Sequence, residues 1–118
     1  LRDDILGVFG APEVTGKPAG DDLREGKETY LVMLARQRAD RAGRQLLEGA
    51  LGNAKLSEDE VAELRRLSTA CGAVDATEAR IAVLLAEAKD ALAAADGIDE
   101  TARATLAALA DHVTDRSA

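Results

Sequence analysis

The residues with the clearest chemical potential lie together near the start of the chain. Residues 3–27, DDILGVFGAPEVTGKPAGDDLREGK, contain two pairs of neighbouring aspartates, two lysines and five glycines. Carboxylates can hold a divalent cation, lysine can contact phosphate oxygens, and glycine lets backbone amides approach an anion closely. This combination indicates a site for a metal ion together with a phosphorylated ligand.

Asp3 and Asp4 are neighbours on an expected helix, so their side chains point about 100° apart and cannot both face one metal ion. The natural partner of Asp3 stands one turn later, at position 7, which is glycine. One aspartate can therefore reach a cation while the other orients a lysine or a water. Mg²⁺ suits a site with so few carboxylate ligands, because it keeps several waters and takes one or two carboxylates plus phosphate oxygens. A solvated surface pair is the alternative interpretation.

Lys17 and Lys27 flank the segment KPAGDDLREGK, where lysine charge and glycine freedom suit phosphate oxygens. A Walker-type phosphate loop is excluded, because Gly10 and Gly16 enclose five residues and Pro18 follows the lysine. A glycine-rich surface loop, whose lysines balance nearby acids, is the alternative. Taken together, the carboxylates, lysines and glycines favour a diphosphate bound with Mg²⁺, since an acidic protein needs cations to hold such an anion.

Composition limits the classes of function. The 118 residues suffice for one domain, and the net charge of −7 with a pI near 4.7 argues against nucleic-acid binding. No apolar run is long enough to span a bilayer and no secretory leader is present, so we expect a cytoplasmic protein without stable membrane insertion. Cys71 is the single cysteine and cannot form an internal disulfide. We expect it to be a small buried side chain, with a catalytic thiol as the alternative.

Apolar spacing predicts an all-α protein without strands. The sequence SEDE at residues 57–60 is a capping box that opens one helix. Gly10 to Gly26 shows no periodicity and predicts a long loop, of the kind that is usually functional or disordered. The predicted helices cover residues 1–9, as the last turns of a helix whose beginning is missing, 30 to 42 or 43, 46–51, 57–72, 75 or 77 to 95, and from 99 onward.

The opening residues resemble a known family. The string LRDDILGVFG followed by TGKPAGDDLREGKET is similar to the second aspartate-rich region, and the loop after it, of the all-trans isoprenyl diphosphate synthases. These enzymes form the polyprenyl synthetase family, and the bacterial geranylgeranyl-type members are the most similar. The specific match covers residues 1 to about 35. The resemblance implies that residues 1–118 form the C-terminal helical portion of one isoprenoid-synthase bundle, with the N-terminal half absent from this chain.

The resemblance also implies an activity. Such an enzyme condenses an allylic diphosphate with isopentenyl diphosphate, with Mg²⁺ as cofactor, to make a longer all-trans prenyl diphosphate. By resemblance, Asp3 holds one Mg²⁺ against the leaving diphosphate, Asp4 is its neighbour in the motif, and Asp22 contacts the metal through water. Lys17 and Lys27 match the lysines that neutralise the diphosphate oxygens, which makes them both substrate-binding and catalytic through electrostatics.

Three departures from the family pattern matter. Gly7 stands where the family commonly has a third aspartate, in DDxxD. Glu28 stands where an arginine or lysine often follows the second lysine, and its negative charge should weaken diphosphate binding unless it points outward. The first aspartate-rich motif and the residues that set product length lie upstream, so we expect the 118 residues to be inactive alone.

Two classes of function follow from the resemblance. The first is a prenyltransferase of isoprenoid biosynthesis, acting as a cytoplasmic homodimer. The alternative is a non-catalytic helical subunit, or a decayed relative that acts through protein–protein interaction.

The remaining notable residues have structural interpretations. We expect His112 to be a half-exposed helix residue, with a ligand as the alternative. We expect Tyr30 and Met33 to be core residues, with substrate contacts as the alternative. Arg116 lies near a terminus expected to fray, with contact to a diphosphate as the alternative. The arginine-rich run at residues 35–44 predicts a solvated helix face or an edge facing a dimer partner, because no aromatic residues interleave it as they do in many nucleic-acid sites.

Overall fold

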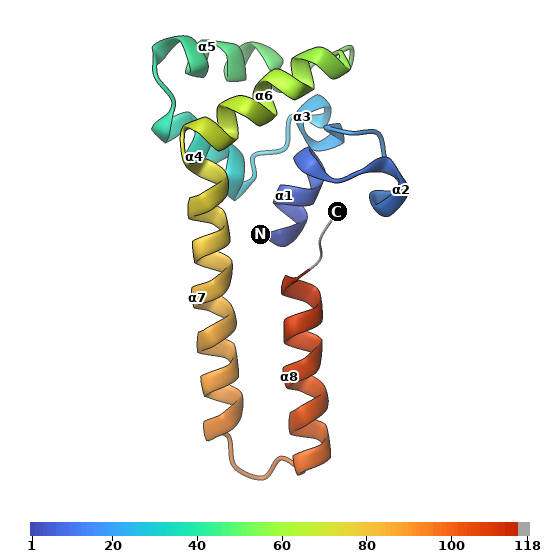
Figure 1. The fold of residues 1–118 in the computed structure, drawn as a ribbon, viewed down its shortest axis with the longest axis vertical. Coiled ribbons are helices and arrows are strands. Elements are labelled where there is room, and N and C mark those ends of the chain that lie inside the picture. The colour runs from blue at the N-terminus through green and yellow to red at the C-terminus, as the bar shows by residue number, and fades with distance from the viewer. Residues whose placement is uncertain (116–118) are drawn as a thin grey trace.

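The computed structural model describes residues 1–115, which form eight α-helices and no strand (Figure 1). The all-α prediction is confirmed. None of the described helices is long and apolar enough to cross a membrane. The helices are α1 (Arg2–Phe9), α2 (Pro12–Thr15), α3 (Asp21–Glu25), α4 (Tyr30–Arg38), α5 (Arg41–Ala50), α6 (Glu58–Ala70), α7 (Ala73–Ala94) and α8 (Glu100–Thr114).

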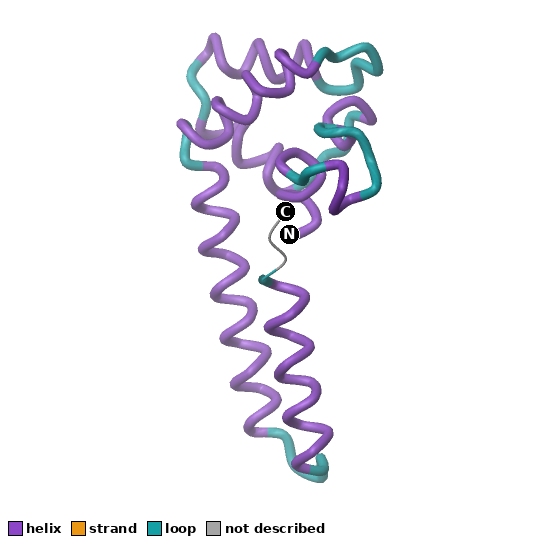
Figure 2. The backbone as a smooth tube through the Cα atoms, turned by 45° about the vertical axis from the view of Figure 1, so that its right-hand side comes forward, coloured by secondary structure: helices purple, strands orange, loops and turns teal. Residues whose placement is uncertain are grey.

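The helices form two regions, which we call the head (α1 to α6) and the arm (α7 and α8). The six head helices gather at one end of the molecule, and the arm runs away from them as a long antiparallel hairpin (Figures 1 and 2). The principal extents of 52 × 29 × 18 Å reflect this elongated shape. Because α8 returns along α7, its last turn comes back to the start of α1.

The apolar core lies in the head and takes in the first turn of α7. Leu31, Leu47, Val61 and Leu64 are each at most 2% exposed, and each such side chain contributes about 1.5 to 3 kcal/mol by leaving water. Ala73, the first residue of α7, is completely buried in the same cluster. By contrast, α8 contains no buried residue. The head therefore holds the packing energy, and the arm extends from it.

Two short helices interrupt the segment that the sequence predicts to be a loop. Pro12 takes the first helical position of α2, where its missing N–H costs nothing. Gly20, with φ of 75°, precedes α3, and Gly26, with φ of 71°, ends it. Helices of four and five residues are too short to show an apolar period. The prediction of an unstructured loop over Gly10 to Gly26 is therefore wrong in these two places.

Helix boundaries also differ from the prediction, and the helix expected at 46–51 is α5, which begins at Arg41. α4 ends at Arg38, before the predicted boundary at 42 or 43, because Asp40 begins a new helix by accepting a hydrogen bond from the Gly43 amide at 2.8 Å. α7 begins at Ala73, directly after Gly72, and not at residue 75 or 77. The predicted capping box at Ser57 is confirmed in both of its hydrogen bonds.

The observed burial of single side chains agrees with the prediction at some positions and differs at others. Tyr30 packs against the core as predicted, but Met33 is 38% exposed, so its core assignment is wrong. Met33 lies on the solvent face of α4, opposite the buried pair Leu31 and Leu34. Cys71 is half-buried, and its thiol donates a weak hydrogen bond to the Ser68 carbonyl at 3.6 Å. Arg116 lies outside the described residues.

Candidate functional site

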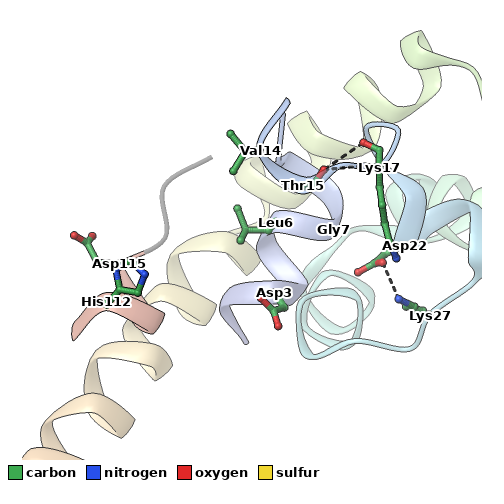
Figure 3. A pocket seen from close by; sticks show the side chains of 10 residues that line it. All are labelled: Asp3, Leu6, Gly7, Val14, Thr15, Lys17, Asp22, Lys27, His112 and Asp115. Atoms are coloured by element: carbon green, nitrogen blue, oxygen red, sulfur yellow. Dashed lines mark hydrogen bonds and ion pairs between the residues drawn. The ribbon is translucent and has the colours of Figure 1, made fainter. Parts of the chain in front are cut away.

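One pocket gathers most of the residues that the sequence predicts to be functional. Its volume is about 660 Å³, and α1, α2, α3 and the end of α8 border it (Figure 3). The lining residues are Asp3, Leu6, Gly7, Val14, Thr15, Lys17, Asp22, Lys27, His112 and Asp115. The structure therefore brings together four of the five predicted site residues, two aspartates and two lysines.

Contacts with α6 fix the position of α1, the helix that carries Asp3. Near its C-terminal end, the Arg65 guanidinium of α6 donates to the Val8 carbonyl at 2.7 Å and lies 5.9 Å from the centre of the Phe9 ring. Ile5 and Val8 are buried on the inner face of the helix. Asp3 lies on the outer, exposed face and lines the pocket.

Asp4 points in another direction, as expected for neighbouring residues on a helix. It does not line the pocket, and its Oδ2 accepts a hydrogen bond from the backbone amide of Tyr30 at 3.3 Å. Tyr30 is the first residue of α4, so this contact joins α1 to the start of α4. A metal-binding role for Asp4 stays a prediction that this arrangement does not support.

A tight turn positions Lys17 at the rim of the pocket. Gly16 has φ of 71°, a left-handed conformation that favours glycine. The Lys17 amide donates to Thr15 Oγ1 at 3.3 Å, which holds the turn against α2. The Lys17 side chain is 56% exposed, and its Nζ lies 3.7 Å from Asp21 Oδ2. The ammonium group is therefore accessible to a ligand and only loosely paired.

α3 is fastened to the head, and this fixes the position of Asp22. The Arg24 guanidinium donates to the Leu56 carbonyl at 2.9 Å and to the Ala19 carbonyl at 2.6 Å. Gly20 packs so closely on α6 that a Cβ at this position would lie 2.7 Å from a methyl group of Val61. Asp22 in the first turn of α3 is therefore placed by packing on α6.

Lys27 and Asp22 form a local unit at the two ends of α3. Lys27 Nζ lies 3.1 Å from Asp22 Oδ1 and 3.3 Å from Glu25 Oε2, and the Lys27 amide donates to the Asp22 carbonyl at 3.0 Å. The hydrogen bond to Asp22, and then the one to Glu25, raise the pKa of Lys27. Lys27 therefore stays positively charged while its charge is already balanced by carboxylates.

Glu28, the acidic departure from the family pattern, is paired with a cation. Its two carboxylate oxygens lie 2.8 and 3.0 Å from the Arg36 guanidinium, which also contacts Glu48. These hydrogen bonds lower the pKa of Glu28. Glu28 is absent from the pocket lining, so its charge faces α4 and not the lysines. The exposed Arg38, Arg41 and Arg44 agree with the predicted solvated face of the arginine-rich run.

The charges of the pocket explain why an anion would need a cation here. Three aspartates and two lysines line it, which gives a formal charge of −1 with the histidine counted as neutral. Among residues 1–115, no group of three histidine, cysteine, aspartate or glutamate side chains is placed to hold a metal ion. The donors present nonetheless fit Mg²⁺, because this ion takes one or two carboxylates and completes its shell with waters and phosphate oxygens.

His112 and Asp115 are pocket residues that the sequence did not reveal. Both lie at the end of α8, and His112 is exposed, where the sequence predicted a half-exposed helix position. They reach the pocket because Arg2, next to Asp3, donates to the Thr114 carbonyl at 2.7 Å and forms a two-pronged pair with Glu78 of α7. Nothing in the local sequence indicates this contact, since 112 residues separate its two ends.

This arrangement defines an all-α protein with a site suited to a metal ion and an anion. A sequence profile described as "Polyprenyl synthetase" matches residues 1–68. Geranylfarnesyl diphosphate synthase of Aeropyrum pernix is 38% identical over 98% of this chain, which covers 35% of that protein. (2E,6E)-farnesyl diphosphate synthase of Mycobacterium tuberculosis is 35% identical over the whole chain, which covers 33% of that protein.

A solved structure is also similar. The crystal structure of geranylgeranyl pyrophosphate synthase from Corynebacterium glutamicum, complexed with isoprenyl diphosphate and magnesium, superposes with a TM-score of 0.91 at 41% identity. The superposition covers 98% of this chain and 33% of that chain. The chain belongs to the polyprenyl synthetase family. It spans about a third of the length of these relatives.

Proposed function

We propose that the protein carrying this chain is a trans-prenyltransferase that condenses an allylic diphosphate with isopentenyl diphosphate. The observation that carries this proposal is the convergence of Asp3, Asp22, Lys17 and Lys27 on one pocket, in a chain whose relatives are named as prenyl diphosphate synthases. In the reaction, the allylic C–O bond breaks and its electron pair leaves with the diphosphate. The isopentenyl double bond then attacks the allylic carbon, and loss of a proton forms the new double bond.

The two lysines bind the leaving group in this proposal. Lys17 and Lys27 are compact charges on opposite ends of the 17–27 segment, and each is accessible, at 56% and 47% exposure. Because carboxylates balance both lysines at rest, an arriving diphosphate must compete for them. This competition favours a ligand that brings its own divalent cation to the aspartates. The lysines then stabilise the charge that grows on the leaving oxygen.

The aspartates would hold the cofactor. Asp3 would bind Mg²⁺ directly and Asp22 through a water, while Asp4 would contribute by fixing α1 against the start of α4. When bound, Mg²⁺ would neutralise negative charge on the departing diphosphate. A cytoplasmic homodimer completes the proposal. The exposed apolar side chains Leu106, Leu109 and Val113 of α8, each 46% to 54% exposed, are surface that further packing would cover.

The test is a prenyl-transfer assay on the protein that carries this chain, with allylic and isopentenyl diphosphates and with or without Mg²⁺. We expect Mg²⁺-dependent formation of a longer prenyl diphosphate, reduced about 100-fold in Asp3→Asn, the range seen when one electrostatic stabiliser of a transition state is removed. Asp90→Asn, on the exposed face of α7, is the matched control and should retain the parent rate. Equal rates for both variants would remove Asp3 from the site.

The lysines are tested in the same assay. Lys17→Ala should raise the KM for a diphosphate substrate or lower kcat, whereas Lys55→Ala, an exposed lysine outside the pocket, should change neither. A protein that folds and dimerises but forms no product with any allylic diphosphate would instead support a non-catalytic partner. Sedimentation equilibrium measures the dimer independently of turnover.

A further inference from the structure

The head carries a groove between α5 and α6, away from the pocket that holds Asp3 and Lys17. Two hollows of about 550 and 210 Å³ make up this outer groove, and Leu46 lines both of them. The first hollow joins Ala42 of α5 to Ala70 of α6, and the second joins Gly49 of α5 to Glu60 of α6. The two helices are therefore antiparallel, and the outer groove follows both of them at one end of the molecule (Figure 1).

Gly49 keeps part of the outer groove open, although α5 does not need a glycine there. Its φ is not positive, and a Cβ built on it would meet no atom of the described residues within 4 Å. Gly43 differs, because a Cβ there would lie 2.7 Å from a methyl group of Leu67. Glycine inside a helix is less stable than alanine. The notch at Gly49 therefore indicates room for a side chain from another molecule.

The outer groove combines an apolar floor with two charged side chains that lack ion-pair partners. Leu46, Leu64 and Leu67 supply the apolar surface. Glu63 and Arg66 of α6 line the groove and are exposed, and neither has an ion-pair partner among residues 1–115. They are three residues apart on one helix face, so their charges are both available to an approaching surface.

The charge changes sign along the outer groove. The end at the start of α6 carries the three acidic residues of its first turn, Glu58, Asp59 and Glu60. The opposite end has Arg66 and, at the start of α5, the exposed Arg41. A partner of a single charge sign would be repelled at one of these ends. A second copy related by a two-fold axis places the basic end of each copy on the acidic end of the other.

We propose that the outer groove is a contact surface for a second copy of this chain, with α6 of the two copies antiparallel. Glu63 of each copy then faces Arg66 of the other, and a side chain of the second copy fills the notch at Gly49. The apolar floor supplies the buried area, and the charges fix the direction of docking. This contact is separate from the exposed apolar surface of α8. It does not rest on the proposed function, because the outer groove shares no lining residue with the pocket of Asp3.

Sedimentation equilibrium of the protein that carries this chain, over a range of concentrations, measures the association of copies. Arg66→Glu should lower the association constant about tenfold or more, because two Glu–Glu contacts replace two Arg–Glu contacts. Arg80→Glu is the matched control, since it makes the same change of charge at an exposed position of α7 outside the groove. It should stay within about twofold of the parent, because salt screens distant surface charges.

A mixture of two variants tests the predicted pairing directly. Glu63→Arg should dissociate the copies as Arg66→Glu does, because two arginines then oppose each other in each contact. An equal mixture of the two variants should associate about as strongly as the parent, since every glutamate again faces an arginine. Circular dichroism verifies that both variants fold.

Gly49→Gln separates docking from stability. Glutamine favours a helix more than glycine does, so the Tm should not fall. The new side chain occupies the notch, so the association constant should fall about tenfold or more. A glycine that served only the fold would give the opposite pair of results, a lower Tm with unchanged association.

Several outcomes would overturn the contact. They are parent-like association in Arg66→Glu and Gly49→Gln, equal losses in Arg66→Glu and Arg80→Glu, and a mixture of folded variants that stays dissociated. A parent protein that remains monomeric at every concentration would also overturn it, and the outer groove would then belong to a partner of a different kind.

Discussion

The head and the arm contribute to the same pocket but are stabilised in different ways. The head places Asp3 and Asp22 on helices, and Lys17 and Lys27 in the turns after α2 and α3, around a closed apolar core. The arm brings His112 and Asp115 on a helix with no buried residue. Its last turn is held through polar contacts, above all the Arg2 guanidinium. The difference shows that one site can join residues fixed by packing with residues fixed by a few directed hydrogen bonds.

The polar contacts of the arm are distributed along its length. At the far end, Arg103 donates to the carbonyls of Leu92 and Ala95 and so closes the turn between α7 and α8. Nearer the head, Lys89 pairs with Asp111 at 2.5 Å. Only at the start of α7 do Ala73, Thr77 and Ile81 become buried. The arm should therefore open locally at a lower free energy than the head.

The largest expected effect compares a leucine of each region. Leu64→Ala, which empties a site 1% exposed in the head, should lower the free energy of unfolding by about 2 to 5 kcal/mol. Leu109→Ala removes the same atoms from α8, where the side chain is 54% exposed, and should stay within about 0.5 kcal/mol of the parent. Urea denaturation measures both. Similar losses would mean that α8 is packed as tightly as the head.

The second effect isolates the contact between the two regions. Arg2→Met keeps the aliphatic stem but removes the pair with Glu78 and the hydrogen bond to the Thr114 carbonyl. We expect the last amides of α8 to exchange with solvent about tenfold faster, while the amides of α6 are unchanged. Arg80→Met, at an exposed position of α7, is the control. Exchange that rises equally in both helices would show that Arg2 supports the whole molecule and not the docking of α8.

The third comparison uses the same chemistry in both regions. Ser57 caps α6 in the head and Asp99 caps α8 in the arm, each through hydrogen bonds to backbone amides. Ser57→Ala and Asp99→Ala should each cost about 1 kcal/mol of helix stability. The first loss should appear in global urea unfolding and the second mainly in local hydrogen exchange of α8. A global loss in Asp99→Ala would show that the arm unfolds together with the head.

The smallest effect concerns the exposed ion pairs of the head. Arg36 lowers the pKa of Glu28 below its ordinary value of 4.5, so the stabilisation is present above that pH and is lost as the pH falls through the lowered pKa. Glu28→Gln should lower Tm slightly near neutrality, and this difference from the parent should disappear as the pH falls below 4.5, which flattens the acid limb of a plot of Tm against pH. Parallel acid limbs for the variant and the parent would show that the pair is not formed in solution.

Local patterns predicted most of the elements, and local patterns together with the family resemblance predicted four charged pocket residues of the head. The capping box at Ser57 and the long apolar periods of α6, α7 and α8 depend on residues that are close in sequence, so the sequence alone predicts them. Asp3, Lys17, Asp22 and Lys27 lie within one short stretch, and chain connectivity keeps them close. The brief helices α2 and α3 escaped prediction, because five residues or fewer cannot display a helical period.

The sequence by itself determined an all-α chain of an acidic protein, with carboxylates, lysines and glycines concentrated near its start. It could not determine that Asp4 turns toward Tyr30, that Met33 faces solvent, or that His112 meets the pocket. It also could not show that the Asp22 carboxylate fills the space beside Gly7. Those outcomes depend on how helices distant in sequence pack and pair, and packing energies belong to the assembled surfaces and not to any single segment.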